Sequence, residues 1–138
     1  MFKRFAHITL ALSLIVSTIA LGWVPAKADI SSCSSSVTPH SVEPDSTTDF
    51  SFQLTNTDPN PIHWIRITRP SSNFTITANS APGWQSTTSS RFAFQTNGTL
   101  NSGQTLTITV TASAGSTEIP SENWKVEASE DPGVNIVS

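Results

Sequence analysis

The chain has 138 residues, with 7 Lys and Arg, 10 Asp and Glu and a single cysteine. Residues 1–28 contain three of the basic side chains and none of the acidic ones, so residues 29–138 carry four basic and ten acidic side chains, a net charge of −6. This charge argues against nucleic-acid binding, which needs a basic patch; the lone Cys33 excludes an intramolecular disulfide, so a hydrophobic core has to stabilise the fold.

Residues 1–28 have the features of a signal peptide. Two basic residues precede an apolar run without charge over residues 8–24, and the segment ends in the small-x-small pattern that signal peptidase accepts. We expect cleavage after Ala28 and export to the secreted space or the cell surface. Two alternatives stay open: an uncleaved membrane anchor, because the apolar run approaches the length of a spanning helix, and lipidation at Cys33.

The remainder of the chain has the length of one domain. Residues 29–36 are rich in serine and are predicted to be a flexible lead-in, so the domain is expected over residues 37–138. Its first strand is predicted near Val37. A second short extended segment around Val42 is flanked by prolines, which donate no backbone hydrogen bond and therefore favour the edge of a sheet.

Alternation of apolar and polar side chains predicts three clear strands. Successive side chains of an extended chain point to opposite faces, and such alternation occurs over residues 47–57, 91–95 and 105–112. The last two segments flank a turn-rich stretch with an Asn-Gly pair and are predicted to be antiparallel. The apolar faces are predicted to meet in one interior, formed by Phe50, Phe52, Phe92, Phe94, Leu106, Ile108 and Val110.

Residues 62–69, IHWIRITR, alternate ambiguously, because both faces carry large apolar side chains. If Ile65 and Ile67 face the core, Trp64 and Arg66 lie side by side on the exterior as a binding surface. If Trp64 faces inward, it becomes the central aromatic side chain of the core. The apolar area of a tryptophan favours an inward or half-covered Trp64.

Shorter alternating segments at residues 74–78, 124–128 and 134–136 complete the predicted strands, with turns around residues 56–61 and 81–84. No stretch has helical periodicity of useful length. Seven to nine short strands, with turn signals about every 8 to 12 residues, are typical of an immunoglobulin-like or fibronectin-like sandwich. The sequence therefore predicts an all-β, two-layer antiparallel sandwich.

Three segments resemble the bacterial extracellular immunoglobulin-like and fibronectin type III-like domains: residues 44–56 (PDSTTDFSFQLTN), 103–111 (GQTLTITVT) and 124–133 (WKVEASEDPG). In that group a Pro/Gly turn leads into a Phe-rich strand that ends in Asn-Thr, and a Trp-x-Val strand precedes an Asp-x-Gly turn. The resemblance spans most of the chain after the leader. It implies an immunoglobulin-like sandwich outside the membrane, and no particular chemistry.

A second resemblance is to the cellulose-binding sandwich modules, which stack exposed tryptophans on sugar rings. It rests on residues that occur in similar order: Asn56-Thr57, Trp64, Pro82-Gly83-Trp84, and Leu100 with Gly103. A flat indole covers the apolar face of a pyranose, and neighbouring polar side chains bind its hydroxyls. The resemblance implies that the sugar-binding residues are Trp64, Arg66, Trp84 and Gln85. A tryptophan beside a Pro-Gly turn can equally cap the end of the core.

Residue patterns for catalysis or metal binding are weak. His40 and His63 are far apart in sequence and have no Cys or carboxylate at the spacing of zinc ligands. Glu127, Glu130 and Asp131 form an acidic turn that is a weak calcium candidate, because no loop with regular oxygen spacing is present. No nucleophile signature occurs. We therefore expect no cofactor and no enzyme; a small hydrolase remains an alternative if a serine or carboxylate meets His63 in a cleft.

Together these features predict an exported, non-catalytic structural or interaction module of the cell surface or secreted space. The expected partners are other surface or secreted proteins or a polysaccharide, with no membrane insertion after cleavage of the leader. Pairing of an edge strand with the main chain of a partner is one expected mode of binding. The alternative function is a carbohydrate-binding module that uses exposed tryptophans.

Overall fold

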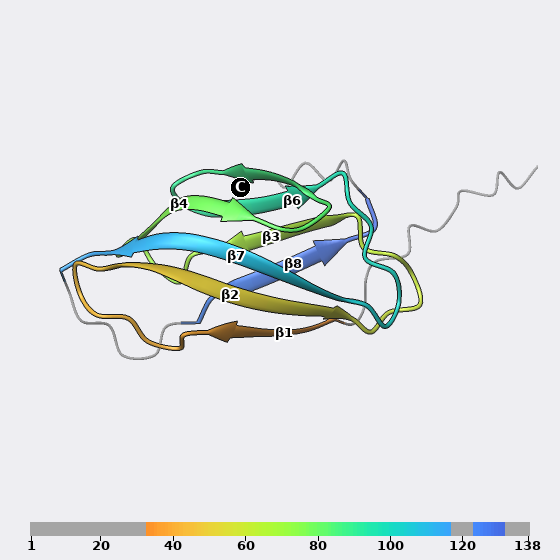
Figure 1. The fold of residues 1–138 in the computed structure, drawn as a ribbon, viewed down its shortest axis with the longest axis horizontal. Helices are drawn as coiled ribbons and strands as arrows, with labels where there is room; N and C mark the ends of the chain where they lie inside the picture. The colour runs from red at the N-terminus through yellow and green to blue at the C-terminus, as the bar shows by residue number, and fades with distance from the viewer. Residues whose placement is uncertain (1–32, 117–122, 132–138) are drawn as a thin grey trace, which may run out of the picture.

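The chain folds as two antiparallel β-sheets of four strands each (Figure 1). The computed structural model describes residues 33–116 and 123–131, which contain eight strands and no helix that could span a membrane. The predicted all-β class is confirmed. The strands are β1 (Cys33–Thr38), β2 (Thr47–Asn56), β3 (Trp64–Thr68), β4 (Phe74–Ser80), β5 (Gln85–Thr88), β6 (Phe92–Thr96), β7 (Thr105–Ala114) and β8 (Lys125–Ser129).

The strand order is β1-β2-β7-β4 in the first sheet and β5-β6-β3-β8 in the second sheet. β2 and β7 form the centre of the first sheet. They pair along most of their length, in a register that aligns Phe52 with Ile108. β3 lies between β6 and β8 in the second sheet. The chain therefore crosses repeatedly from one sheet to the other, and strands that follow each other in the sequence often lie in different layers.

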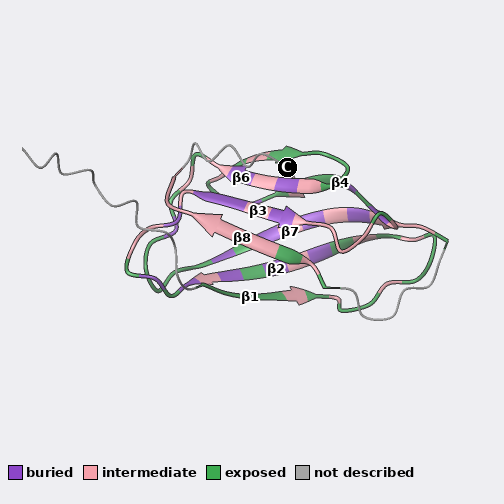
Figure 2. Ribbon diagram, turned by 180° about the vertical axis from the view of Figure 1, so that it is seen from behind, coloured by how far each residue is buried: buried purple, intermediate pink, exposed green. Residues whose placement is uncertain are grey.

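One hydrophobic core lies between the two sheets. Phe50, Phe52 and Leu54 of β2 are almost completely buried, and so are Ile65 and Ile67 of β3. Side chains of β4, β6 and β7 belong to the same cluster. Figure 2 shows buried stretches along β2, β7, β6 and β3, the central strands of the two layers. The apolar faces predicted for β2 and β7 from alternation are therefore the faces that are buried.

The prediction that Phe92 and Phe94 join this core is wrong. Both side chains are half-buried and point to the opposite face of β6. Ala93 and Gln95 are the fully buried residues of this strand. The reason is the pairing of β6 with β3, which aligns Ala93 with Ile67 on the core side. β6 also lies in the second sheet and β7 in the first sheet, so these two strands do not pair with each other.

A polar network closes the edge of the sandwich where β4 approaches β5 and β6. A β-bulge between Ile76 and Ala78 changes the alternation of β4, so Asn79, rather than Ala78, faces the second sheet. The buried Gln95 side chain donates to the Asn79 side-chain oxygen, and Ser86 donates to Gln95 Oε1 at 2.6 Å. Because a buried amide needs partners, this network holds β4 against β5 and β6.

Several boundaries differ from the prediction. β1 begins at Cys33, so part of the predicted lead-in is a strand that pairs with β2. β5 was not predicted, and no strand forms around Val42. β1 and β5 are rich in Ser and Thr and lie at sheet edges, where backbone pairing rather than side-chain burial supports a strand. The leader predicted at residues 1–28 and the strand predicted at residues 134–136 lie outside the described residues.

Candidate functional site

The outer face of the second sheet carries aromatic and charged side chains. Because Ile65 and Ile67 of β3 point into the core, the alternate side chains of β3 point outward. Their direct partners on β6 and β8 share that face, as paired residues of an antiparallel sheet do. We name this surface the aromatic-arginine face; its members are Trp64, Arg66, Phe92, Phe94 and Glu127, with Lys125 at its rim.

Three aromatic side chains form a second, smaller cluster on this face. The ring centroids of Trp64 and Phe94 are 6.0 Å apart, and those of Phe92 and Phe94 are 5.7 Å apart. Trp64 is only 6% exposed, although it does not belong to the main core cluster. The two phenylalanines are half-buried. Apolar area therefore reaches the solvent beside a covered tryptophan.

Arg66 is the polar centre of the aromatic-arginine face. Its Nε and Nη2 lie 2.7 and 2.6 Å from Oε2 of Glu127. Its guanidinium carbon lies 5.2 Å from the ring centroid of Phe92 and 5.8 Å from that of Trp64. Lys125 Nζ contacts the other oxygen of Glu127 at 2.8 Å. A carboxylate thus holds Arg66 in place over two aromatic rings, in the geometry of cation–π contacts.

The two cations determine the acidity of Glu127. Partial burial by itself raises the pKa of this carboxyl, but hydrogen bonds from Lys125 and Arg66 and the positive charges of both outweigh that effect. The pKa of Glu127 therefore lies below its ordinary value. At neutral pH Glu127 is ionised, so Arg66 keeps its partner.

The four residues predicted to bind sugar occupy two different settings. Trp64 and Arg66 contact each other on the aromatic-arginine face. Trp84 packs against the main core from the turn before β5, and a Cβ atom at Gly98 would overlap its indole ring. Gln85, next in the chain, is exposed. Trp64 is buried and Trp84 is half-buried, so neither indole presents a fully exposed flat face. Sugar stacking on these two tryptophans stays a prediction.

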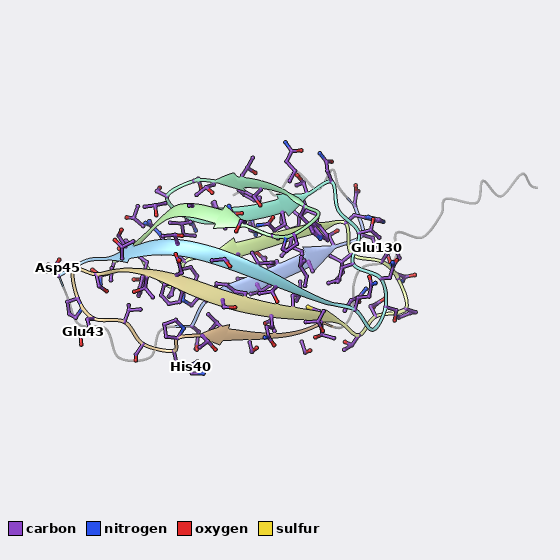
Figure 3. The ribbon with its side chains drawn as sticks, viewed as in Figure 1. His40, Glu43, Asp45 and Glu130 are labelled. Atoms are coloured by element: carbon purple, nitrogen blue, oxygen red, sulfur yellow. The ribbon has the colours of Figure 1, made fainter. Side chains whose placement is uncertain are left out.

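The residues of the predicted calcium turn do not form a ligand set. Glu127 is ion-paired on the aromatic-arginine face, and Glu130 lies where β8 ends (Figure 3). Glu130 Oε1 is enclosed without a hydrogen-bond partner among the described residues, and the backbone N–H of Asp131 donates to Ser129 at 3.1 Å. Within residues 33–116 and 123–131, no three Cys, His, Asp or Glu side chains are grouped so that they could hold a metal ion.

His63 does not form a catalytic pair with the hydroxyl beside it. Its Nδ1 lies 3.0 Å from the carbonyl oxygen of Gly98 and 3.2 Å from the hydroxyl of Thr99. A carbonyl oxygen only accepts hydrogen bonds, so Nδ1 carries the hydrogen and donates it there. A nitrogen that carries a hydrogen cannot accept the proton of Thr99. The contact therefore ties the start of β3 to the loop after β6 and activates no nucleophile.

A groove of about 370 Å³ lies between β1 and β8, at the edge of the sandwich opposite the Gln95 network. Its walls include Val37 and Phe52 from the first sheet and Trp124 and Val126 from the second sheet side. The Trp124 ring centroid lies 5.4 Å from that of Phe52, so this indole fills the space between the layers. The groove is thus a continuation of the core, and Ser35, Ser36, His40 and Asn123 add polar groups to its lining.

Sequence reasoning missed Phe92, Phe94, Arg91 and Lys125 as members of one surface region. The guanidinium carbon of Arg91, the residue before β6, lies 4.9 Å from the Phe92 ring centroid. One signal was available in the sequence: all four basic residues after residue 28 fall in or directly beside the segments that form β3, β6 and β8. Only the order of the strands in the second sheet shows that these segments are neighbours.

A scan of protein-family models finds no match to this chain, and a search of the curated proteins finds none either. The interpretation of the aromatic-arginine face therefore rests on its own geometry and chemistry.

Proposed function

We propose that this protein is an exported, non-catalytic interaction module of the cell surface or the secreted space, and that it binds through the aromatic-arginine face. The observation that supports this most strongly is the outward position of Phe92 and Phe94 on a sheet whose inner face already packs a complete core. Aromatic side chains and arginine are enriched at protein interaction surfaces, and grouped exposed apolar side chains mark such surfaces. Arg66 and Phe94 are the proposed anchors.

Two further features support this role. The leader-like sequence of residues 1–28 supports export. The aromatic-arginine face lies on three hydrogen-bonded strands, and Arg66 is fixed there by Glu127. A side chain that is already ordered loses little conformational freedom when it binds, which favours a binding role.

The proposal is tested with the full chain expressed in the source organism and fractionated into cytosol, envelope and medium. The exported protein should begin at Asp29 when its N-terminus is sequenced. After fluorescent labelling it should associate with intact cells. Phe94→Ser should reduce this association about fivefold or more, which corresponds to the loss of about 1 kcal/mol expected for one interface contact.

A second variant, Thr87→Lys, and a control, Thr107→Ser, show whether a loss of association comes from the aromatic-arginine face. Thr87 is exposed and pairs directly with Phe94, so Thr87→Lys places a charge beside the aromatic side chains without removing packed atoms. It should reduce association while the thermal unfolding midpoint stays unchanged. Thr107→Ser, on the exposed face of the first sheet, should have no effect. Retention of the protein in the cytosol, or equal association of all variants, would contradict the proposal.

A further inference from the structure

The four basic residues that follow the predicted leader lie in one region of the fold. Residues 29–138 as a whole carry a net charge of −6. Arg66 lies in β3, Arg69 follows β3 directly, Arg91 precedes β6, and Lys125 begins β8. The backbone N–H of Arg69 donates to the Arg91 carbonyl at 3.1 Å, and Thr68 is the direct partner of Lys125. Strand pairing in the second sheet therefore concentrates positive charge that is dispersed in the sequence.

A pocket of about 450 Å³ lies where these three strands meet at one end of the second sheet. Three basic side chains line it, Arg69, Arg91 and Lys125, and no acidic side chain among the described residues does. The polar groups that complete the lining are the hydroxyls and the amide of Thr68, Ser71, Ser72 and Asn123. These groups can donate hydrogen bonds, so an anion would meet donors beside the three basic side chains, while Pro70 adds an apolar part to the lining.

Two of the three basic side chains, Arg69 and Arg91, are held in place before a ligand binds. Arg69 Nη1 donates to the carbonyl oxygens of Phe74 at 2.6 Å and Ser90 at 3.4 Å, which leaves its other N–H groups for a ligand. Arg91 lies over the Phe92 ring at 4.9 Å. Lys125 is 67% exposed and contacts Glu127, but exposed ion pairs of this kind are weak and exchange readily.

Among the described residues, the acidic side chains near this end of the molecule lie outside the pocket. Glu43 and Asp45 lie at the turn that leads into β2, in the first sheet (Figure 3), and neither lines the pocket. Glu127 contacts Lys125 at the edge of the basic cluster, and its other oxygen is bound by Arg66. The pocket is therefore a local positive site on a domain with excess negative charge.

We propose that this pocket binds the carboxylate groups of an acidic polysaccharide. The inference rests on the proposed function of an exported binding module and names the class of its ligand. Arginine and lysine bind carboxylates through charge-assisted hydrogen bonds, and the hydroxyl and amide groups of the lining match the hydroxyls of a sugar ring. A polymer with one carboxylate per sugar has a lower charge density than nucleic acid, whose phosphates the net charge of −6 repels.

The proposal is tested by affinity electrophoresis of the exported protein through gels that contain polygalacturonate, dextran, dextran sulfate or single-stranded DNA. Polygalacturonate should retard the wild-type protein, and dextran should not. Arg91→Gln and Lys125→Gln should each weaken the affinity for polygalacturonate about tenfold, as expected for the loss of one hydrogen bond to a charged group. The affinity should fall as salt is raised, since the contact is electrostatic.

The control is Thr107→Glu, which changes the net charge by the same amount as Arg91→Gln but lies on the exposed face of the first sheet. It should keep the affinity within about twofold, because exposed charges farther apart than the Debye length are screened. Inorganic sulfate should compete only in large excess over the polymer. The proposal is overturned if Thr107→Glu weakens binding as much as Arg91→Gln, if DNA binds as tightly as polygalacturonate, or if the two pocket variants bind like wild type.

The same variants separate this inference from the proposed function. If polygalacturonate does not bind, but Phe94→Ser still reduces association with cells, the polysaccharide inference is wrong and the interaction module stands. If neither polysaccharide binding nor cell association depends on the second sheet, both proposals are wrong.

Discussion

The two sheets share one core but have outer faces of opposite character. On the first sheet, outward side chains of β2 and β7 are almost all polar, and they form hydrogen bonds across the strands: Thr55 with Thr105 at 2.8 Å, Thr47 with Ser113 at 2.9 Å, and Thr111 with Asp49 at 2.7 Å. On the second sheet, the outward positions hold Trp64, Phe92, Phe94 and Arg66.

This difference supports the second outer face as the proposed binding surface. Threonine hydroxyls satisfy one another and water, so the first outer face is complete in solvent, and threonine also suits an extended strand. Half-exposed aromatic side chains leave apolar area in contact with water, which costs about 25 cal/mol for each Å² that a partner does not cover. The second outer face therefore gains from being covered, whereas the first does not.

The largest expected effect comes from Trp64, the most deeply covered residue of the aromatic-arginine face. Trp64→Ala should lower the free energy of unfolding by about 3 kcal/mol, because it removes a buried indole and leaves a cavity. Thr107→Ala on the first outer face should change it by less than about 0.5 kcal/mol. Urea denaturation of both variants measures the difference. A loss below about 1 kcal/mol for Trp64→Ala would show that the second face has no packed cluster of its own.

Phe94→Thr makes the second outer face resemble the first at a single position. Since Phe94 is half-buried, the free energy of unfolding should fall by about 1 kcal/mol, less than for a fully buried side chain. Association with cells should fall by a larger factor than the stability change explains. Urea denaturation and the cell-association assay, run on the same preparation, compare the two. Unchanged association would remove Phe94 from the proposed interface.

The ion pair between Arg66 and Glu127 should make the stability of the second face depend on acid. The pKa of Glu127 is lower in the folded protein than its ordinary value. Its contribution is therefore fully present above the pKa of an unfolded glutamate, about 4.3, and is lost as the pH falls through the lower folded pKa. Glu127→Gln should be less stable than wild type at pH 7, with the difference shrinking toward pH 3. Thermal unfolding across this range measures the convergence; a constant difference would contradict it.

The smallest expected effect is on the first outer face. Thr111→Val removes the hydroxyl that donates to Asp49 at 2.7 Å but keeps a β-branched side chain, and both partners are accessible to water. The free energy of unfolding should change by no more than about 0.5 kcal/mol, and cell association should not change. A loss above about 1.5 kcal/mol in urea denaturation would show that the hydroxyl pairs of this face are more than a solvated surface.

Much of the fold follows from alternation along the sequence. In β2 and β7 every second side chain is large and apolar, and the intervening ones are polar, so only one choice of face buries the apolar set. Phe52 and Ile108 lie where this pattern requires, and the all-β class follows from it. The acidic balance and the single cysteine are likewise properties of the sequence alone.

The tertiary structure alone decided which faces of β3 and β6 point inward. β3 carries large apolar side chains on both faces, so alternation gives two solutions there. In β6 alternation favours the face of Phe92 and Phe94, and this prediction is wrong because the choice depends on which neighbours complete the core. In β6 the small Ala93 and the amide of Gln95 turn inward, because Ile67 and the Asn79 network occupy the space beside them, and Phe92 and Phe94 are left outside. The same strand pairing brings Arg69, Arg91 and Lys125 together, since proximity in a sheet depends on strand order and not on distance along the chain.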